Sequence, residues 1–279
     1  MTLLLEAALS ALARQLEPNG TRLLICGGFG LVLRHRHIQQ SGATTLMELV
    51  PVRSTEDVDL LLTEDIITDA EQAKRLRLAL DELGYDVVEK AKHFQFKRDV
   101  TLGGQSRSIK FDLLAPEPAE RTSVKINGAR IRPHGVKNIH ARLTPEAFSA
   151  HEHPLETQVG ADNALIRIVH PFTHMVMKLH ALRDRLDDSR TDYGRRHALD
   201  LYRLLAMTTE EDDWEVAPRL CRKYETEPAL HETRELIQDL FLTPDGRGRL
   251  RMREAARAEG LDVDIAQVAQ HLKEWFEVP

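Results

Sequence analysis

The sequence predicts an α+β protein with a mixed sheet and flanking helices in its N-terminal half and a helical C-terminal domain. Short apolar runs separated by glycine and proline turns fill the N-terminal half, as is typical of strands. From Pro171 onward the apolar positions recur at helical spacing. A length of 279 residues with 42% hydrophobic residues suits two domains with buried cores, which we expect at 1–160 and 161–279.

The N-terminal half opens with an apolar pattern of helical spacing. We expect a helix at 2–16, which Pro18-Asn19-Gly20 ends. A buried strand at 22–26 leads directly into Gly27-Gly28, and a helix follows the two glycines. The remaining elements expected in this half are an irregular segment at 40–54, a strand at 57–62, a helix at 68–83 closed by Gly84, a hairpin of strands 85–97 and 107–114, and a second hairpin turning at Asn127-Gly128.

The C-terminal half is expected to be helical after one last strand at 165–169. Pro171 suits the first position of a helix, because a backbone N–H is not needed there. The helices expected from this point are 171–188, 192–207, 212–225, 229–242, 246–259 and 264–277.

Charge and cysteine content exclude several classes of protein. With 38 basic and 44 acidic residues the net charge is −6, which excludes a bulk cationic nucleic-acid coat but leaves room for a local basic groove. Two cysteines cannot build a disulfide framework or a Cys-rich zinc site, and they favour a reducing cytosol. No uninterrupted apolar run of about 18 residues exists, so we expect a cytoplasmic protein without a membrane span.

Three carboxylates are the main candidates for chemistry. Asp57 and Asp59 lie two residues apart in a predicted strand and therefore share one face. Paired carboxylates need a cation or a proton, and their hard oxygen atoms suit Mg²⁺. Asp112 interrupts an apolar strand, and beside the Asp57 strand it would complete a site for phosphoryl transfer with two metal ions. The alternative is that these residues are acidic strand ends in solvent.

Glycines and cations supply the second group of candidates. Gly27 and Gly28 allow a sharp turn that brings backbone N–H groups close to a phosphate, although a tight turn alone also explains them. Lys178 and Arg185 lie seven residues apart on one predicted helix face, which Asp200 of the next helix is placed to meet. Such cations neutralise triphosphate oxygens, whereas the alternative is an ordinary solvated stripe.

Together these residues resemble the nucleotidyltransferase fold of the polymerase-β type. The downstream segment with Lys178, Arg185 and Asp200-Leu-Tyr narrows the resemblance to the nucleotidyltransferase toxins of AbiE-type (AbiEii, type IV) toxin–antitoxin systems, over about residues 22–207. The N-terminal positions that carry the resemblance are Gly27-Gly28, Arg53-x-Thr55-x-Asp57-Val58-Asp59 and Asp112.

The resemblance implies transfer of a nucleoside monophosphate from an NTP to an acceptor, with release of pyrophosphate. Some members of the family use tRNA ends as acceptors. The implied roles are Mg²⁺ ligands for Asp57, Asp59 and Asp112, with Asp112 alternatively the base for the acceptor hydroxyl; nucleotide binding for Gly27, Gly28, Arg53 and Thr55; triphosphate binding for Lys178 and Arg185; and orientation of these two cations for Asp200. One departure from the family pattern is Phe29, where a small polar residue is expected after the glycines.

The function expected from the resemblance is that of a Mg²⁺-dependent nucleotidyltransferase toxin with an RNA or protein acceptor and a cognate antitoxin. One alternative is transfer to a small molecule such as an aminoglycoside, which predicts an acidic pocket. Another is a nucleotide-binding regulatory module that has lost catalysis, which Phe29 favours and the three carboxylates oppose. Arg249, Arg253 and Arg257 recur every four residues, as a stripe that either tracks RNA or docks an antitoxin.

Overall fold

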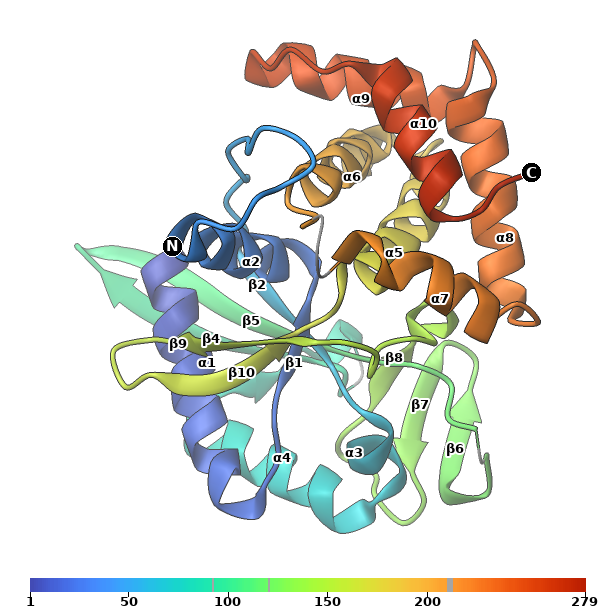
Figure 1. The fold of residues 1–279 in the computed structure, drawn as a ribbon. Coiled ribbons are helices and arrows are strands. Elements are labelled where there is room, and N and C mark those ends of the chain that lie inside the picture. The colour runs from blue at the N-terminus through green and yellow to red at the C-terminus, as the bar shows by residue number, and fades with distance from the viewer. Residues whose placement is uncertain (92, 120, 210–212) are drawn as a thin grey trace. The chain divides into compact units, whose positions relative to one another are not determined.

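The chain divides into two compact units. A computed structural model describes residues 1–91, 93–119, 121–209 and 213–279. Residues 1–34 and 53–169 form the first unit, and residues 35–52 and 170–279 form the second. Within the described residues every strand belongs to the first unit, while helices dominate the second, which confirms the α+β fold class (Figure 1).

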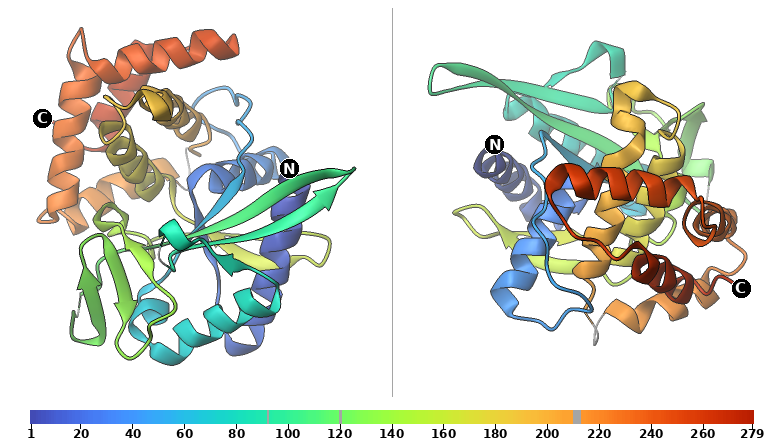
Figure 2. Two further views of the ribbon diagram at one scale, coloured as in Figure 1. Left: turned by 180° about the vertical axis from the view of Figure 1, so that it is seen from behind. Right: turned by 90° about the horizontal axis from the view of Figure 1, so that it is seen from above.

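The first unit is built on one mixed sheet. Its described residues form ten strands in the order β6-β7-β8-β5-β2-β1-β10-β9, with β4 paired to β5 and β3 to β4. Neighbours β2 and β5 run parallel, whereas β1 and β2 run antiparallel. The long β4–β5 hairpin extends beyond the rest of the sheet (Figure 2). The strands are β1 Leu24–Cys26, β2 Asp57–Leu61, β3 Asp86–Val87, β4 Gln95–Leu102, β5 Gln105–Ala115, β6 Val124–Asn127, β7 Arg130–Pro133, β8 Ala141–Leu143, β9 Leu155–Val159 and β10 Ala164–Ile168.

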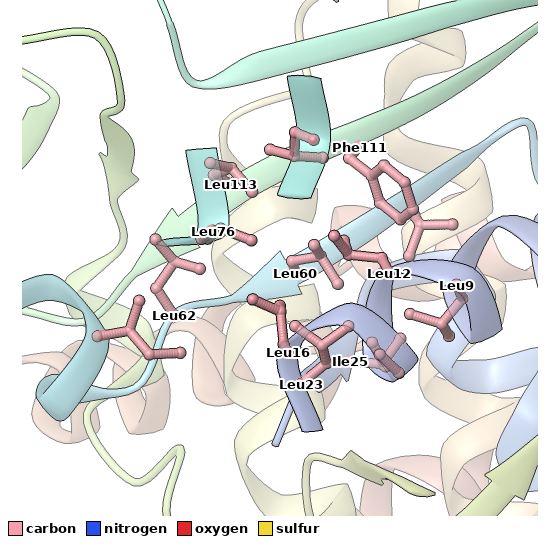
Figure 3. Close-up of a cluster of buried hydrophobic side chains, with 14 of the residues drawn as sticks. Leu9, Leu12, Leu16, Leu23, Ile25, Leu60, Leu62, Leu76, Phe111 and Leu113 are labelled. Atoms are coloured by element: carbon pink, nitrogen blue, oxygen red, sulfur yellow. The ribbon is translucent and has the colours of Figure 1, made fainter. Parts of the chain in front are cut away.

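One face of this sheet packs against helices and forms the core of the unit. The side chains of Leu9, Leu12 and Leu16 from α1 lie against Leu60 and Phe111 of the central strands (Figure 3). All five are fully or almost fully buried, so this face is apolar because every second residue of β2 and β5 points into it. The helices of this part of the chain are α1 Thr2–Leu16, α2 Gly27–Ser41, α3 Glu64–Thr68 and α4 Ala70–Glu82.

Several expected elements are present with different boundaries. The helix expected at 68–83 is α4, which begins at Ala70 because the Asp69 side chain caps it by accepting a hydrogen bond from the Glu71 N–H at 2.7 Å, and a separate short helix, α3, precedes it. The strand expected at 85–97 is interrupted by a 3₁₀ turn at Glu89–Ala91. The second hairpin is confirmed, but its turn lies one residue later than expected, because Asn127 pairs with Arg130.

The sheet also extends past residue 160, where the sequence suggests a domain boundary. Strands β9 and β10 pair antiparallel, with Val159 opposite Ala164, so residue 160 lies in the turn of a hairpin. Among the described residues the first unit ends at Val169.

The second unit contains the helices expected from the apolar periodicity. Pro171 occupies the first turn of α5, and His170 caps this helix through a hydrogen bond from the Phe172 N–H to Nδ1 at 3.1 Å. The start of the helix expected at 212–225 lies outside the described residues. The helices are α5 Pro171–Arg183, α6 Arg195–Ala206, α7 Val216–Lys223, α8 Pro228–Ile237, α9 Arg247–Glu259 and α10 Ile265–Trp275. No described helix is both long and apolar enough to cross a membrane.

Residues 35–52 pack on the helices of the second unit. The Leu46 N–H donates to the Thr208 carbonyl at 3.0 Å, and Thr45 forms an isolated bridge with Thr209. Arg203 donates from Nε to the Pro51 carbonyl at 2.9 Å. The segment expected to be irregular is therefore fixed to this unit by backbone hydrogen bonds.

Candidate active site

The turn from β1 into α2 requires glycine at its first position. Gly27 has a φ of +64°, which side chains rarely tolerate, and a Cβ there would lie 1.7 Å from Oδ2 of Asp59. A Cβ at Gly28 would lie 3.0 Å from Oγ1 of Thr55. The glycine pair thus lets the backbone at the start of α2 approach two polar side chains that the sequence assigns to the site.

The predicted shared face of Asp57 and Asp59 is confirmed. Val58 and Leu60 are buried in the core, while the two aspartates alternate with them and are half-buried. Oγ1 of the buried Thr55 donates to Oδ1 of Asp57 at 2.8 Å. Thr55 therefore fixes the orientation of the first carboxylate.

Asp112 lies on the strand beside these two residues, as the sequence requires for a three-carboxylate site. Strands β2 and β5 pair in parallel with Asp59 directly opposite Asp112, so their side chains are on the same face. Gln95 of β4 is the register partner of Asp112 on its other side, and Nε2 donates to Oδ1 of Asp112 at 2.6 Å.

The electrostatic environment of Asp112 disfavours its charged form. Burial raises the pKa of Asp112 above its ordinary value; the hydrogen bond from Gln95 opposes this rise, and the negative charge of Asp57 adds to it. The positive charges of Lys110 and Arg142 act in the opposite direction. A partly desolvated carboxyl group beside another negative charge is an environment that a divalent cation compensates.

The carboxylate oxygens of this face fit Mg²⁺ by their chemistry. Hard oxygen ligands from one or two carboxylates, together with substrate phosphates, are what this ion prefers. Over the part of the chain that the structure describes, no group of three or more His, Cys, Asp or Glu side chains is arranged closely enough to hold a metal ion by itself. Asp57, Asp59 and Asp112 therefore share one face of the sheet without forming such a group.

Lys178 in the second unit is buried, which contradicts the alternative of a solvated stripe. It is 4% exposed, and Nζ lies 2.7 Å from Oδ2 of Asp200, which is fully buried. Arg203 donates from Nη1 to the other oxygen of Asp200 at 3.2 Å. The predicted contact between Lys178 and Asp200 is thus present as part of a buried cluster with two cations.

Arg185 is not on the same helix face as Lys178. Helix α5 ends at Arg183, with Asp184 as its C-cap, so Arg185 lies beyond the regular helix. Its Nη1 donates to the Ala181 carbonyl at 3.0 Å. The spacing of seven residues predicted a common face only under the assumption of a helix that continued to 188.

Comparison with known proteins agrees with the resemblance. The sequence matches the family described as "Nucleotidyl transferase AbiEii toxin, Type IV TA system" over residues 10–274. The chain belongs to the AbiEii nucleotidyltransferase toxin family. The match extends to the helices after residue 207, where the sequence offered no parallel.

Two solved structures share low sequence identity with this AbiEii family member. One is an antigenic nucleotidyltransferase-like protein from Paracoccidioides brasiliensis, with 14% identity, a TM-score of 0.36, and coverage of 96% of this chain and 92% of the other. The second is the antibiotic-resistance factor ANT(2'')-Ia in solution, with 11% identity, a TM-score of 0.33, and coverage of 81% and 98%. No curated protein matches the sequence.

Two contacts of this AbiEii chain escaped the sequence analysis. Gln95 is the hydrogen-bond donor to Asp112, and counting the hairpin register outward from Gly103-Gly104 would have placed the two opposite each other. Arg203 binds Asp200 from three residues further along α6, a spacing that puts both on one helix face. Phe29, the departure from the family pattern, is fully buried in the core and does not face the site.

Replacing Asp112 by Asn is expected to raise the melting temperature of the metal-free protein at pH 7. Because the folded-state pKa of Asp112 is raised, its ionisation destabilises the fold, and wild-type stability falls as the pH rises from the ordinary value of 3.8 through the folded pKa. The gain of Asp112→Asn should therefore disappear below about pH 3.8. Thermal unfolding monitored by circular dichroism in the presence of a chelator, from pH 3 to 8, measures it.

The matched control for this prediction is Asp99→Asn on the same hairpin. The hydrogen bond from Ser108, followed by the charge of Lys97, lowers the pKa of this exposed carboxyl, so its removal should bring no gain at pH 7. Equal melting temperatures for Asp112→Asn and wild type at pH 7 would show that the surroundings of Asp112 do not destabilise its charged form.

Proposed function

We propose that the protein is a Mg²⁺-dependent nucleotidyltransferase that transfers a nucleoside monophosphate from an NTP to an RNA acceptor such as tRNA. The proposal includes the role of a toxin held in check by a cognate antitoxin, which the family description suggests, and a location in the cytoplasm. The observation that carries it is the placement of Asp57, Asp59 and Asp112 on one face of two paired strands, beside the glycine turn that opens α2.

The residues of the first unit have separate proposed roles. Asp57 and Asp59 would hold Mg²⁺, with Asp112 as a third ligand or as the base that takes the proton of the acceptor hydroxyl. When bound, Mg²⁺ neutralises phosphate charge and stabilises the attacking and leaving oxygens. A raised pKa makes Asp112 a stronger base than an ordinary aspartate, which suits it to the second role. The backbone N–H groups at Gly27 and Gly28, with Arg53 and Thr55, would bind the nucleotide phosphates.

The residues of the second unit would contribute positive charge. Lys178 and Arg185 are the proposed triphosphate ligands, and Asp200 positions Lys178. In the transfer itself the acceptor oxygen forms a bond to the α-phosphorus and the bond to pyrophosphate breaks; the hydroxyl proton passes to Asp112 if this residue is the base.

An acidic hollow in the second unit favours the small-molecule alternative. Glu48, Asp262 and Asp264, with Tyr202 beside them, line a hollow of about 620 Å³. Burial, and then the charges of Glu48 and Asp262, raise the pKa of Tyr202. Such a surface would attract a cationic acceptor such as an aminoglycoside, and it is the feature that this alternative predicts.

Incubation with each α-labelled NTP, Mg²⁺ and one acceptor at a time decides between these functions. We expect label in RNA when total RNA is the acceptor, and none when a mixture of aminoglycosides replaces it. Label in the aminoglycosides alone would establish the second function, and label in neither would refute transfer to both acceptors. Omission of Mg²⁺ should abolish the signal.

A further inference from the structure

The outer strands of the sheet carry a row of positive side chains on one face. In β6 and β7, Lys125 pairs directly with Arg132, and Asn127 pairs with Arg130. Arg130 also pairs with Arg142 of β8. Because paired residues of neighbouring strands project to the same side, these side chains form one polar face, while Val124, Ile131 and Ala141 are buried on the other.

The polar face of β6, β7 and β8 contains a depression whose lining has no acidic side chain. A depression of about 260 Å³ is lined by Lys125, Asn127, Arg130, Arg132, Lys137 and His140. Among the described residues, none of the four cations of this lining, nor Arg142, forms an ion pair with a carboxylate. In α9, Arg247 pairs with Asp187 and Arg251 pairs with Glu254, while Arg253 and Arg257 form no ion pair with a described residue.

This row of cations is electrostatically unfavourable unless an anionic ligand neutralises it. Like charges directly opposite each other in a sheet are destabilising, and here two such pairs occur in succession, Lys125 with Arg132 and Arg130 with Arg142. Burial lowers the pKa of His140, and the positive charges of His93, Arg132 and Arg130 lower it further. The local potential is therefore positive in a chain whose net charge is −6.

The positive face continues into the carboxylate site. Leu114 lies two residues after Asp112 on β5 and pairs with Arg142 of β8, so Arg142 and Asp112 project to the same side of the sheet. The charge of Arg142 also acts on the Asp112 carboxyl group. From β5 to β6 the strand order is β5-β8-β7-β6, a distance of about 14 Å at ordinary strand spacing.

We propose that the outward face of β6, β7 and β8 binds the phosphodiester backbone of the RNA acceptor and leads its end to Asp112. The inference rests on the proposed function for the identity of the polymer. The cations of the row would neutralise backbone phosphates while contributing no sequence preference. A nucleic acid is favoured over an acidic protein because the lining is charged and polar, without the aromatic or apolar anchors that protein interfaces bury at their centre.

Removal of two positive charges from the row tests the proposal by direct binding. The double variant Lys125→Gln with Arg130→Gln leaves the hydrogen bonds of the fold intact, since neither side chain makes one to a described residue. Fluorescence anisotropy of 5′-fluorescein-labelled tRNA, without NTP, should give an affinity on the order of tenfold weaker at low salt. The slope of log affinity against log salt should become shallower by about 1.4 to 1.8, or 0.7 to 0.9 for each lost phosphate contact.

The matched control is the double variant Arg253→Gln with Arg257→Gln. It removes the same two charges from exposed positions of α9, the helix whose arginine stripe the sequence suggested for RNA. Its affinity and salt slope should stay at the wild-type values. A loss of RNA affinity in the α9 variant alone would move the RNA surface to α9 and overturn the proposal.

The remaining outcomes separate this proposal from the proposed function. If the wild-type enzyme labels RNA but the Lys125/Arg130 variant retains the wild-type affinity and slope, the row is not the acceptor surface. Retained RNA binding with lost antitoxin binding would likewise overturn it in favour of a protein partner. If the wild-type protein labels no RNA and yet the variant shows the shallower slope, the proposed function fails while the surface stands.

Discussion

Replacing Asp59 by Asn is expected to lower nucleotidyl transfer at least about a hundredfold at saturating Mg²⁺, with the fold intact. Asn keeps the size of the side chain that packs against Gly27, where a Cβ would lie 1.7 Å from Oδ2 of Asp59. It removes the negative charge, and with it the main attraction for a divalent cation on this face. Initial rates of labelled NMP incorporation, with a thermal melt of the same sample, measure both parts of the prediction.

The control for this variant is Glu56→Gln, which neutralises an exposed carboxylate three residues before Asp59. It changes the net charge of the chain equally but leaves both carboxylates of the shared face in place, so the rate of transfer should remain close to that of the wild type. Should Asp59→Asn retain more than about a tenth of wild-type activity at saturating Mg²⁺, the assignment of Asp59 as a metal ligand is wrong.

The carboxylate face could be predicted because strand geometry is local. The period of two in a strand puts Asp57 and Asp59 together whenever Val58 and Leu60 are in the core, and the structure has this arrangement. The position of Asp112 beside them depends on which strands pair. Local patterns do not determine this pairing, so the sequence predicted the three-carboxylate site only on the condition that the two strands are neighbours. The parallel pairing of β2 with β5 meets that condition and brings Asp112 opposite Asp59.

Contacts between distant segments could not be predicted from local patterns. The hydrogen bond from Gln95 to Asp112 depends on the register of the hairpin, and a shift by one residue would put Gln95 on the other face. Residues 40–52 resemble a surface loop in composition, but the hydrogen bond from Arg203 to the Pro51 carbonyl fixes them to the helical unit. Neither contact can be recognised from residues that recur at helical or strand spacing in the sequence.

Helix ends were the other source of error. Residues 172–188 contain no proline or glycine to stop a helix, yet α5 ends at Arg183 and the chain passes into a turn at Asp184. This shortening is why Arg185 does not share a helix face with Lys178. Tertiary packing of the apolar positions, rather than local propensity, decides where such a helix ends.

Burial of Lys178 leads to the second large prediction, that Lys178→Met lowers the free energy of unfolding by about 3 kcal/mol. A lysine in a solvated stripe would lose almost nothing on this change. The structure instead shows its ammonium group 2.7 Å from Asp200, whose side chain is fully buried. Removal of one partner of a buried ion pair leaves a charge without its main counterion in a place that water does not reach, which is costly even when Met fills the space of the lysine stem.

Arg203 limits this loss because its Nη1 donates to Oδ1 of Asp200 at 3.2 Å, a contact that the substitution does not remove. The expected change is therefore at the lower end of the range for a broken buried pair, and urea unfolding at pH 7 with an unchanged m-value measures it.

The matched control is Lys74→Met. Its ammonium group lies at the same 2.7 Å from a carboxylate, that of Glu71, but both side chains are more than half exposed. Water screens such a pair, so this variant should unfold at nearly the wild-type urea concentration. The two lysines thus differ in burial and not in contact distance. If Lys178→Met were as stable as Lys74→Met, the 2.7 Å contact with Asp200 would contribute nothing to the stability of the fold. The presence of a lysine at this position would then have to be explained by binding of triphosphate.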